Sequence, residues 1–277
     1  MKNTLLVAVW IVAGLSLVAG GAFAGTLGSN ITIPDESYSS PSGWYGGPNQ
    51  EDQEVEPNNV TGQDFDLEGT FFDDVSSDLS MVGGYDFVNG VPRFRVSSGD
   101  LFIDVTGDAQ YGTGVHAPAN YNPYQIVSDT FGYDFVIDLD FSTLTYAVYD
   151  IRANGSLLTI QTDSEQQNDA ANPWRYVPFH TVPIATGAIG YASGLLDSDP
   201  IINGYGLTGG LHNAATVNIA WLAPYYDPEI GFTSHFTQEC GNDNLMGHFN
   251  SNVPEPATLS LLGLGLLGAV MRKKFWA

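Results

Sequence analysis

The stretch Phe135-Val136-Ile137-Asp138-Leu139-Asp140-Phe141 shows most directly how this chain folds. Apolar residues stand at every second position, and the last two gaps between them hold Asp138 and Asp140. Because successive side chains of a β-strand point to opposite faces, this alternation predicts a strand with one buried face and one polar face. The same alternation recurs in Leu101-Phe102-Ile103-Asp104-Val105.

Other segments of the body extend this pattern. Leu144–Tyr149 and Leu157–Ile160 are rich in β-branched and aromatic residues, which favour strands. The pairs Asn89-Gly90 and Asn154-Gly155 are typical of tight turns between antiparallel strands. No helical period runs over three turns of the body. We therefore predict an all-β fold over residues 64–252, an antiparallel β-sandwich that is jelly-roll-like.

The charge of the body is strongly negative. The chain has 31 acidic and 8 basic residues, and four of the basic residues lie close to its two ends. Between residues 25 and 252 this leaves four arginines and no lysine. Such a surface has no basic patch that could displace counterions from phosphates, which excludes nucleic acid as a partner. An acidic surface favours solubility and attracts divalent cations.

The N-terminal residues have the parts of a signal peptide. Lys2 precedes the apolar run Leu5–Val18, and Ala22-Phe23-Ala24 is a small-x-small cleavage site. We expect residues 1–24 to direct export through the general secretion machinery, with cleavage after Ala24. Residues 25–63 are rich in turn formers and include the acidic run Glu51–Pro57, a composition that predicts a flexible acidic linker.

The C-terminal residues have a different order of parts. Val253-Pro254-Glu255-Pro256 is followed by the apolar run Ala257–Met271 and by the cations Arg272, Lys273 and Lys274. Cations after an apolar run hold its end on the cytoplasmic side of a membrane. As a helix, about 15 residues span roughly 22 Å of a hydrocarbon core of about 30 Å. The segment is therefore short for a permanent anchor and suits transient insertion.

This tail resembles the PEP-CTERM sorting signal of Gram-negative bacteria, in which an exosortase recognises a Pro-Glu-Pro motif, a transmembrane helix and a basic cluster. The resemblance covers residues 253–277. It implies an exported protein that is transiently anchored in the inner membrane, processed near Pro254-Glu255-Pro256, and delivered to the cell surface or extracellular matrix. Three segments of the body also resemble parts of ectodomains of PEP-CTERM proteins: Ser98–Asp104, Phe131–Asp134 and Ser234–Asp243.

The candidate site residues are mainly aspartates. Calcium takes about six to eight oxygen ligands, which Asp-rich turns supply. Two groups of candidate calcium ligands follow from the sequence: Asp100, Asp104 and Asp108, and Asp134, Asp138 and Asp140. A zinc site is a weaker alternative, because the spacing of its possible ligands matches no established zinc pattern. These ligands are His235, Cys240, Asp243 and His248.

The sequence favours a non-enzymatic function. It contains no Gly-x-Ser-x-Gly, His-Glu-x-x-His or Cys-x-x-Cys motif. We expect a structural or adhesive role in exopolysaccharide or biofilm. One alternative is a carbohydrate-binding module that presents exposed aromatic residues such as Tyr111, Tyr121, Tyr124 and Trp174. The other is a polysaccharide hydrolase, since Asp138 and Asp140 have a spacing that a pair of catalytic carboxylates can use.

Overall fold

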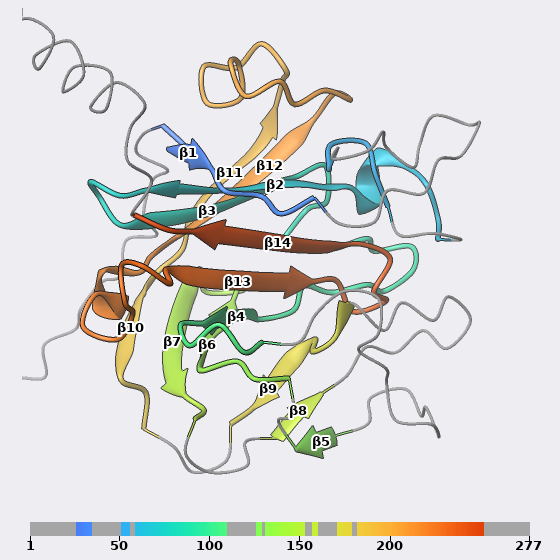
Figure 1. The fold of residues 1–277 in the computed structure, drawn as a ribbon. Coiled ribbons are helices and arrows are strands. Elements are labelled where there is room, and N and C mark those ends of the chain that lie inside the picture. The colour runs from blue at the N-terminus through green and yellow to red at the C-terminus, as the bar shows by residue number, and fades with distance from the viewer. Residues whose placement is uncertain are drawn as a thin grey trace, which may run out of the picture.

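The computed structural model describes residues 26–34, 51–55, 59–109, 126–128, 131–152, 157–159, 171–178 and 182–251 (Figure 1). The expected signal peptide with Ala22 and Ala24 lies outside the described residues. So do the sorting motif Val253-Pro254-Glu255-Pro256, the cations Arg272, Lys273 and Lys274, and the aromatic candidates Tyr111, Tyr121 and Tyr124.

The described chain forms antiparallel sheets. One sheet has the order β1 (Ser29–Asn30), β2 (Leu67–Asp73), β3 (Asp78–Gly83), β12 (His212–Asn218) and β11 (Gly190–Leu195). The second has the order β10 (Ala185–Ala188), β7 (Thr145–Asp150), β6 (Phe135–Asp140), β4 (Leu101–Asp104), β13 (Phe232–Thr237) and β14 (Asn244–Phe249). A smaller sheet joins β5 (Ile126–Ser128), β8 (Leu157–Thr159) and β9 (Arg175–Val177). The predicted antiparallel β-sandwich is confirmed.

Helical structure is sparse among the described residues. Two 3-10 turns, η1 (Gln63–Phe65) and η3 (Ala220–Leu222), interrupt the strands. Within these parts of the chain, no helix has the length and apolar character needed to cross a membrane.

The space between the two large sheets holds the main core. Phe135, Ile137 and Leu139 of β6 lie in it, together with Leu101 and Ile103 of β4. The residues between them in sequence, Phe102 and Val136, face the other side of the sheet and pack with Tyr133 and Tyr176. The predicted alternation of side chains between the two faces is thus observed on both β4 and β6. At the centre of this sheet, both faces carry buried apolar side chains.

The outer face of the five-stranded sheet is also covered. Phe71, Val82 and Ala214 on this face form a buried cluster with Ile202 and Leu207 from the loop after β11. The rings of Phe71 and Tyr205 pack edge to face, with centroids 4.9 Å apart. This loop therefore lies against the sheet, and it carries two residues of the site described below.

Parts of the expected linker are packed against the sandwich, which corrects the prediction for residues 26–34 and 51–55. Leu27 and Val55 are fully buried, and Ile31 belongs to the main core. Ile31 N–H donates to the carbonyl oxygen of Thr70 on β2, and Ile31 accepts from His248 N–H of β14 at 2.8 Å. The turn formers and acids of this segment hid a few apolar residues that the sheets bury, and Figure 1 shows β1 beside β2.

The loop between β13 and β14 fastens a second part of this segment. Asn242 exchanges two hydrogen bonds with the backbone of Val60, at 2.9 and 2.8 Å. The carboxylate of Asp243 accepts from Leu67 N–H at 2.6 Å, and the Gln238 amide donates to the carbonyl oxygen of Phe65. The loop therefore fixes the entry into β2 through polar contacts.

Replacing Phe135 by alanine should destabilise the sandwich severely. Its side chain is fully buried. The centroid of its ring lies 5.3 Å from the ring centroid of Trp221 and 5.0 Å from that of Tyr225. We expect the free energy of unfolding to fall by about 3 to 5 kcal/mol, measured by urea unfolding. Val75→Ala is the control, because Val75 is 92% exposed and its loss should change the value by less than about 0.5 kcal/mol. Equal effects of the two substitutions would contradict the assigned core.

Candidate functional site

The antiparallel pairing of β4 with β6 rearranges the predicted aspartate groups. Leu101 pairs with Ile137 and Ile103 with Phe135, so Asp100 lies near Asp138 while Asp104 lies near Asp134. Each of the two expected calcium groups is therefore split between the ends of this strand pair. The structure brings together Asp100, Asp138 and Asp140 at one end, and Asp104, Asp108 and Asp134 at the other.

The group at the second end holds a turn. Asp104 accepts hydrogen bonds from the backbone N–H groups of Thr106, Gly107 and Ala109, at 2.9 to 3.1 Å. Asp134 accepts from Val105 N–H at 2.8 Å, and the Thr106 hydroxyl donates to Asp108 at 2.7 Å. These contacts give each of the three carboxylates a hydrogen-bond partner within the turn, and the calcium site predicted there stays a prediction.

The group at the first end lines an open cleft of about 580 Å³. Its walls come from the loop around Phe87–Gly90, the β6–β7 turn and β9. Asp138, Asp140 and Arg175 give this cleft a mixed polar character, and Tyr176 adds an aromatic side chain. Among the described residues, it is where the predicted aspartates meet a cationic side chain and an aromatic ring.

Asp100 is buried at the base of the cleft. One carboxylate oxygen accepts from Leu139 N–H at 3.1 Å, and the other accepts from Tyr176 N–H at 2.8 Å. Burial, followed by the nearby negative charge of Asp138, raises the pKa of Asp100 to about 7. Burial also raises the pKa of Asp138, while Arg175 opposes the rise. Hydrogen bonds from Ser142 and Thr143 lower the pKa of the exposed Asp140.

Arg175 lines the cleft and bonds to the backbone just before β4. Its guanidinium donates twice to the carbonyl oxygen of Ser98, at 3.1 and 2.7 Å, and lies 4.8 Å from the centroid of Trp174. Trp174 itself is buried, so it does not supply the exposed aromatic surface expected for glycan stacking. Tyr176 in the lining of the cleft, which was not among the aromatic residues predicted from the sequence, is equally buried and packs with Phe102 and Val136.

The possible zinc ligands do not converge. His235 is fully buried and stacks on Tyr133 with centroids 5.5 Å apart, and burial lowers its pKa to about 3. His248 contacts the Thr233 hydroxyl at 3.1 Å, while Asp243 bonds the start of β2. In the described ranges, the potential metal-ligating residues that do converge are Asp52, Asp66 and Glu68.

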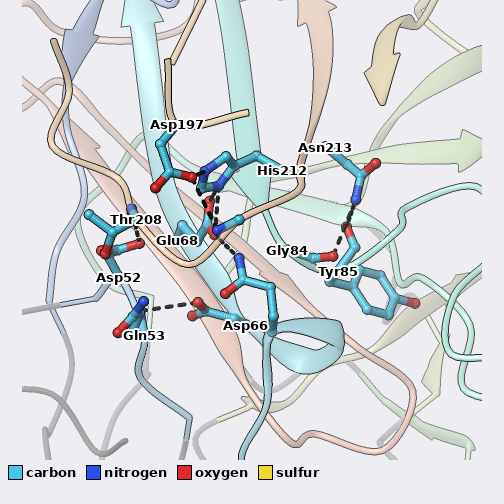
Figure 2. A network of polar contacts seen from close by, with 12 residues as sticks. Asp52, Gln53, Asp66, Glu68, Gly84, Tyr85, Asp197, Thr208, His212 and Asn213 are labelled. Atoms are coloured by element: carbon cyan, nitrogen blue, oxygen red, sulfur yellow. Dashed lines mark hydrogen bonds and ion pairs between the residues drawn. The ribbon is translucent and has the colours of Figure 1, made fainter. Parts of the chain in front are cut away.

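These three carboxylates belong to a buried polar network (Figure 2). Asp66 and Glu68 flank the first residue of β2, and Asp52 comes from the acidic segment 51–55. One oxygen of each carboxylate lies within 4.8 Å of the others. Asp52 accepts from Thr208 N–H and from its hydroxyl, the latter at 2.9 Å. Three segments that are distant in sequence therefore meet at this site.

His212, the first residue of β12, orients one side of the network. Its Nδ1 contacts both Glu68 oxygens, at 2.8 and 2.6 Å, and its Nε2 contacts Asp197 at 3.1 Å. Burial opposes protonation of the imidazole, but the hydrogen bonds and charges of Glu68 and Asp197 outweigh it and raise the pKa of His212. Burial raises the pKa of Glu68 to about 7, although His212 counteracts the rise.

Asp66 is the most deeply buried acid of this network. Burial, then the charges of Glu68 and Asp52, raise its pKa well above the ordinary value. The pKa of Asp52 is raised by burial too, and its bonds with Thr208 oppose this. None of these residues was among the site residues predicted from the sequence. The alternation of Asp66 and Glu68 around Leu67 marks a common strand face, but Asp52, Asp197 and His212 are too far away in sequence to be linked to it.

The carboxyl group of Asp100 should titrate near pH 7, measured by carbon NMR of the side chain. Asp138→Asn should lower this midpoint, because it removes the second largest cause of the raised pKa. Since the pKa exceeds the ordinary 3.8, Asp100 contributes stability fully below about pH 4 and loses it as the pH rises through about 7. Asp74→Asn, on the exposed β2–β3 turn, should leave the midpoint unchanged. A wild-type midpoint near 4 would contradict the assignment.

Comparison with known proteins identifies the tail. Residues 252–274 match the family model of the PEP-CTERM protein-sorting motif. No curated protein and no solved structure matches the chain. The match confirms the resemblance seen in Val253-Pro254-Glu255-Pro256 and the residues after it. This chain carries a PEP-CTERM sorting motif, which implies an exported protein that is transiently anchored in the membrane and processed by exosortase.

Proposed function

We propose that the sandwich is a non-enzymatic component of the cell surface or extracellular matrix, with a structural or adhesive role in exopolysaccharide or biofilm. The observation that carries this proposal is the sorting motif at residues 252–274. A protein that is exported and released from its membrane segment works outside the cytoplasm. A negatively charged body with four arginines and no lysine stays soluble there, because its surface charges repel one another.

The environment of the buried carboxylates also supports a structural role. A glycosidase needs an acid that reaches the glycosidic oxygen and a second carboxylate at the sugar. Both oxygens of Asp100 instead accept backbone N–H groups, from Leu139 and Tyr176. Asp104 and Asp134 are likewise bonded to backbone N–H groups of their own turn. These acids connect strands and turns, which is what a stable extracellular scaffold requires.

Removing the sorting motif should abolish delivery and function together. We expect Pro254→Ala, Glu255→Ala and Pro256→Ala, introduced jointly, to trap the tail-bearing protein in the inner membrane of a bacterium that has an exosortase. Cell fractionation with antibodies to the sandwich and to the tail measures this. Adhesion of the biofilm should fall to the level of a strain that lacks the protein.

Glu229→Ala is the matched control, because it removes an exposed acidic residue from a loop of the sandwich. This variant should be processed and should restore adhesion. Wild-type sandwich found in the cytoplasm would overturn the proposed location. Correct delivery with no loss of adhesion in the deletion strain would overturn the structural role while leaving the sorting intact.

A carbohydrate-binding function is the second candidate, and the cleft is the observation that favours it. Asp138, Asp140 and Arg175 line it with hydrogen-bonding groups. Clefts that bind small ligands commonly hold a small number of placed polar groups, which fix the orientation of the ligand. A short segment of an extracellular polysaccharide offers hydroxyl groups that match such a lining.

The glycan hypothesis predicts that Asp138→Ala weakens binding of the exported protein to exopolysaccharide by at least about tenfold, since one charged hydrogen bond contributes about 1.5 to 3 kcal/mol. Calorimetric titration with oligosaccharides from the same matrix measures the change. Asp74→Ala, at the far turn, should bind like wild type. Binding that is absent in wild type, or equal in both variants, would exclude this cleft as a glycan site.

A further inference from the structure

We propose that Asp52, Asp66 and Glu68 bind a calcium ion that fastens the segment 51–55 to β2, next to the loop after β11. This inference goes beyond the proposed function and does not depend on it. It names a calcium site other than the two groups expected from the sequence, which stay predictions. None of the three ligands was among the six aspartates selected from the sequence.

The spacing of the three carboxylates suits one large cation. Their ligand oxygens lie within 4.8 Å of one another. Oxygens on opposite sides of a calcium ion are about 4.6 to 5.2 Å apart, because each Ca–O distance is about 2.3 to 2.6 Å. Opposite ligands of magnesium are about 4.0 to 4.2 Å apart and need near-ideal octahedral positions. A separation of up to 4.8 Å admits either ion, and calcium is favoured because it tolerates irregular geometry.

A buried oxygen atom gives a second reason to expect a ligand. Asp66 is 0% exposed, and one of its oxygens accepts from Gln53 N–H at 3.1 Å. Its other oxygen has no hydrogen-bond partner among the described residues. Figure 2 shows this carboxylate directed toward Gln53, and one of its oxygens lies within 4.8 Å of oxygens of Asp52 and Glu68. Burying an unpaired carboxylate oxygen is costly, and a cation removes that cost.

The positive charge available from the protein is insufficient. Within the described ranges, the ion pairs formed near the network are those of His212 with Glu68 and Asp197. Even when it is protonated, His212 supplies one positive charge to a network that holds four carboxylates: Asp52, Asp66, Glu68 and Asp197. A divalent cation would offset two of the three remaining negative charges in a part of the chain where the sequence places no lysine or arginine.

The donor set favours calcium over zinc. All three ligands are carboxylates, which suit hard cations such as calcium. Both nitrogens of His212 are engaged, Nδ1 with Glu68 and Nε2 with Asp197. His212 is therefore a positioning residue for Glu68 rather than a ligand. Gln63 adds a buried amide oxygen beside Glu68 that has no hydrogen-bond partner in the described structure.

The test is thermal unfolding of the purified full chain at pH 8, with calcium chloride or with a chelator. Calcium at a hundredfold excess over Kd should raise Tm by about 5 to 10 °C. Magnesium at the same concentration should give a smaller shift. Titration calorimetry with calcium alone should show one site per chain. Asp66→Asn and Asp52→Asn should both abolish the calcium-dependent shift.

Asp52→Asn keeps the test decisive if the buried Asp66 variant fails to fold, because Asp52 is half-buried at the edge of the site. Asp74→Asn is the matched control, since it removes an exposed carboxylate from the β2–β3 turn and should retain the full shift. An unchanged wild-type Tm in calcium, or a shift that survives in Asp52→Asn, would overturn the proposal. Stabilisation by lowering the pH without any response to calcium would show that protons neutralise the cluster.

Discussion

The register of β4 against β6 is the constraint on which much of this structure depends. Pairing Leu101 with Ile137 places the apolar residues of both strands between the large sheets. A shift of one residue would turn these side chains to the outer face and bring aspartates into the core. The same register decides which acids become neighbours, so the core and the cleft are two results of one pairing.

This chain has few cationic side chains, and several of its buried carboxylates are stabilised by backbone N–H groups instead. Asp100, Asp104 and Asp243 accept hydrogen bonds from backbone N–H groups, and each bond joins separate segments or closes a turn. Backbone donors partly replace the missing lysines, but they supply no full positive charge. Glu68 has His212 as a partner, whereas Asp66 has no comparable cationic partner in the described structure. Among the described residues, the buried negative charge of the network around β2 is therefore the least compensated.

Local alternation in the sequence was sufficient to predict strands at 135–140 and 101–104 and, from them, the sandwich. It was insufficient to predict the sites, because the spacing along one strand does not reveal its partner. Asp100 and Asp104 look like one group in the sequence, yet β6 separates them by giving each a different neighbour. Asp52 could not be assigned at all, since the acidic composition of its segment predicts a flexible chain and the few apolar anchors, such as Val55, are easily overlooked.

Packing the segment around Asp52 against the sandwich buries acidic side chains, and the apolar contacts of the segment offset this cost only in part. It buries Val55, but Glu51 and Glu54 are buried beside it and oppose folding by losing water. Cys240 is the only cysteine of the chain, so a disulfide within the chain cannot hold this segment. Contacts among Asp52, Thr208 and the start of β2 join parts of the chain more than 140 residues apart. A cation at their meeting point would act as the missing cross-link, because it restrains a long loop and neutralises the charge that makes the segment unfavourable to bury.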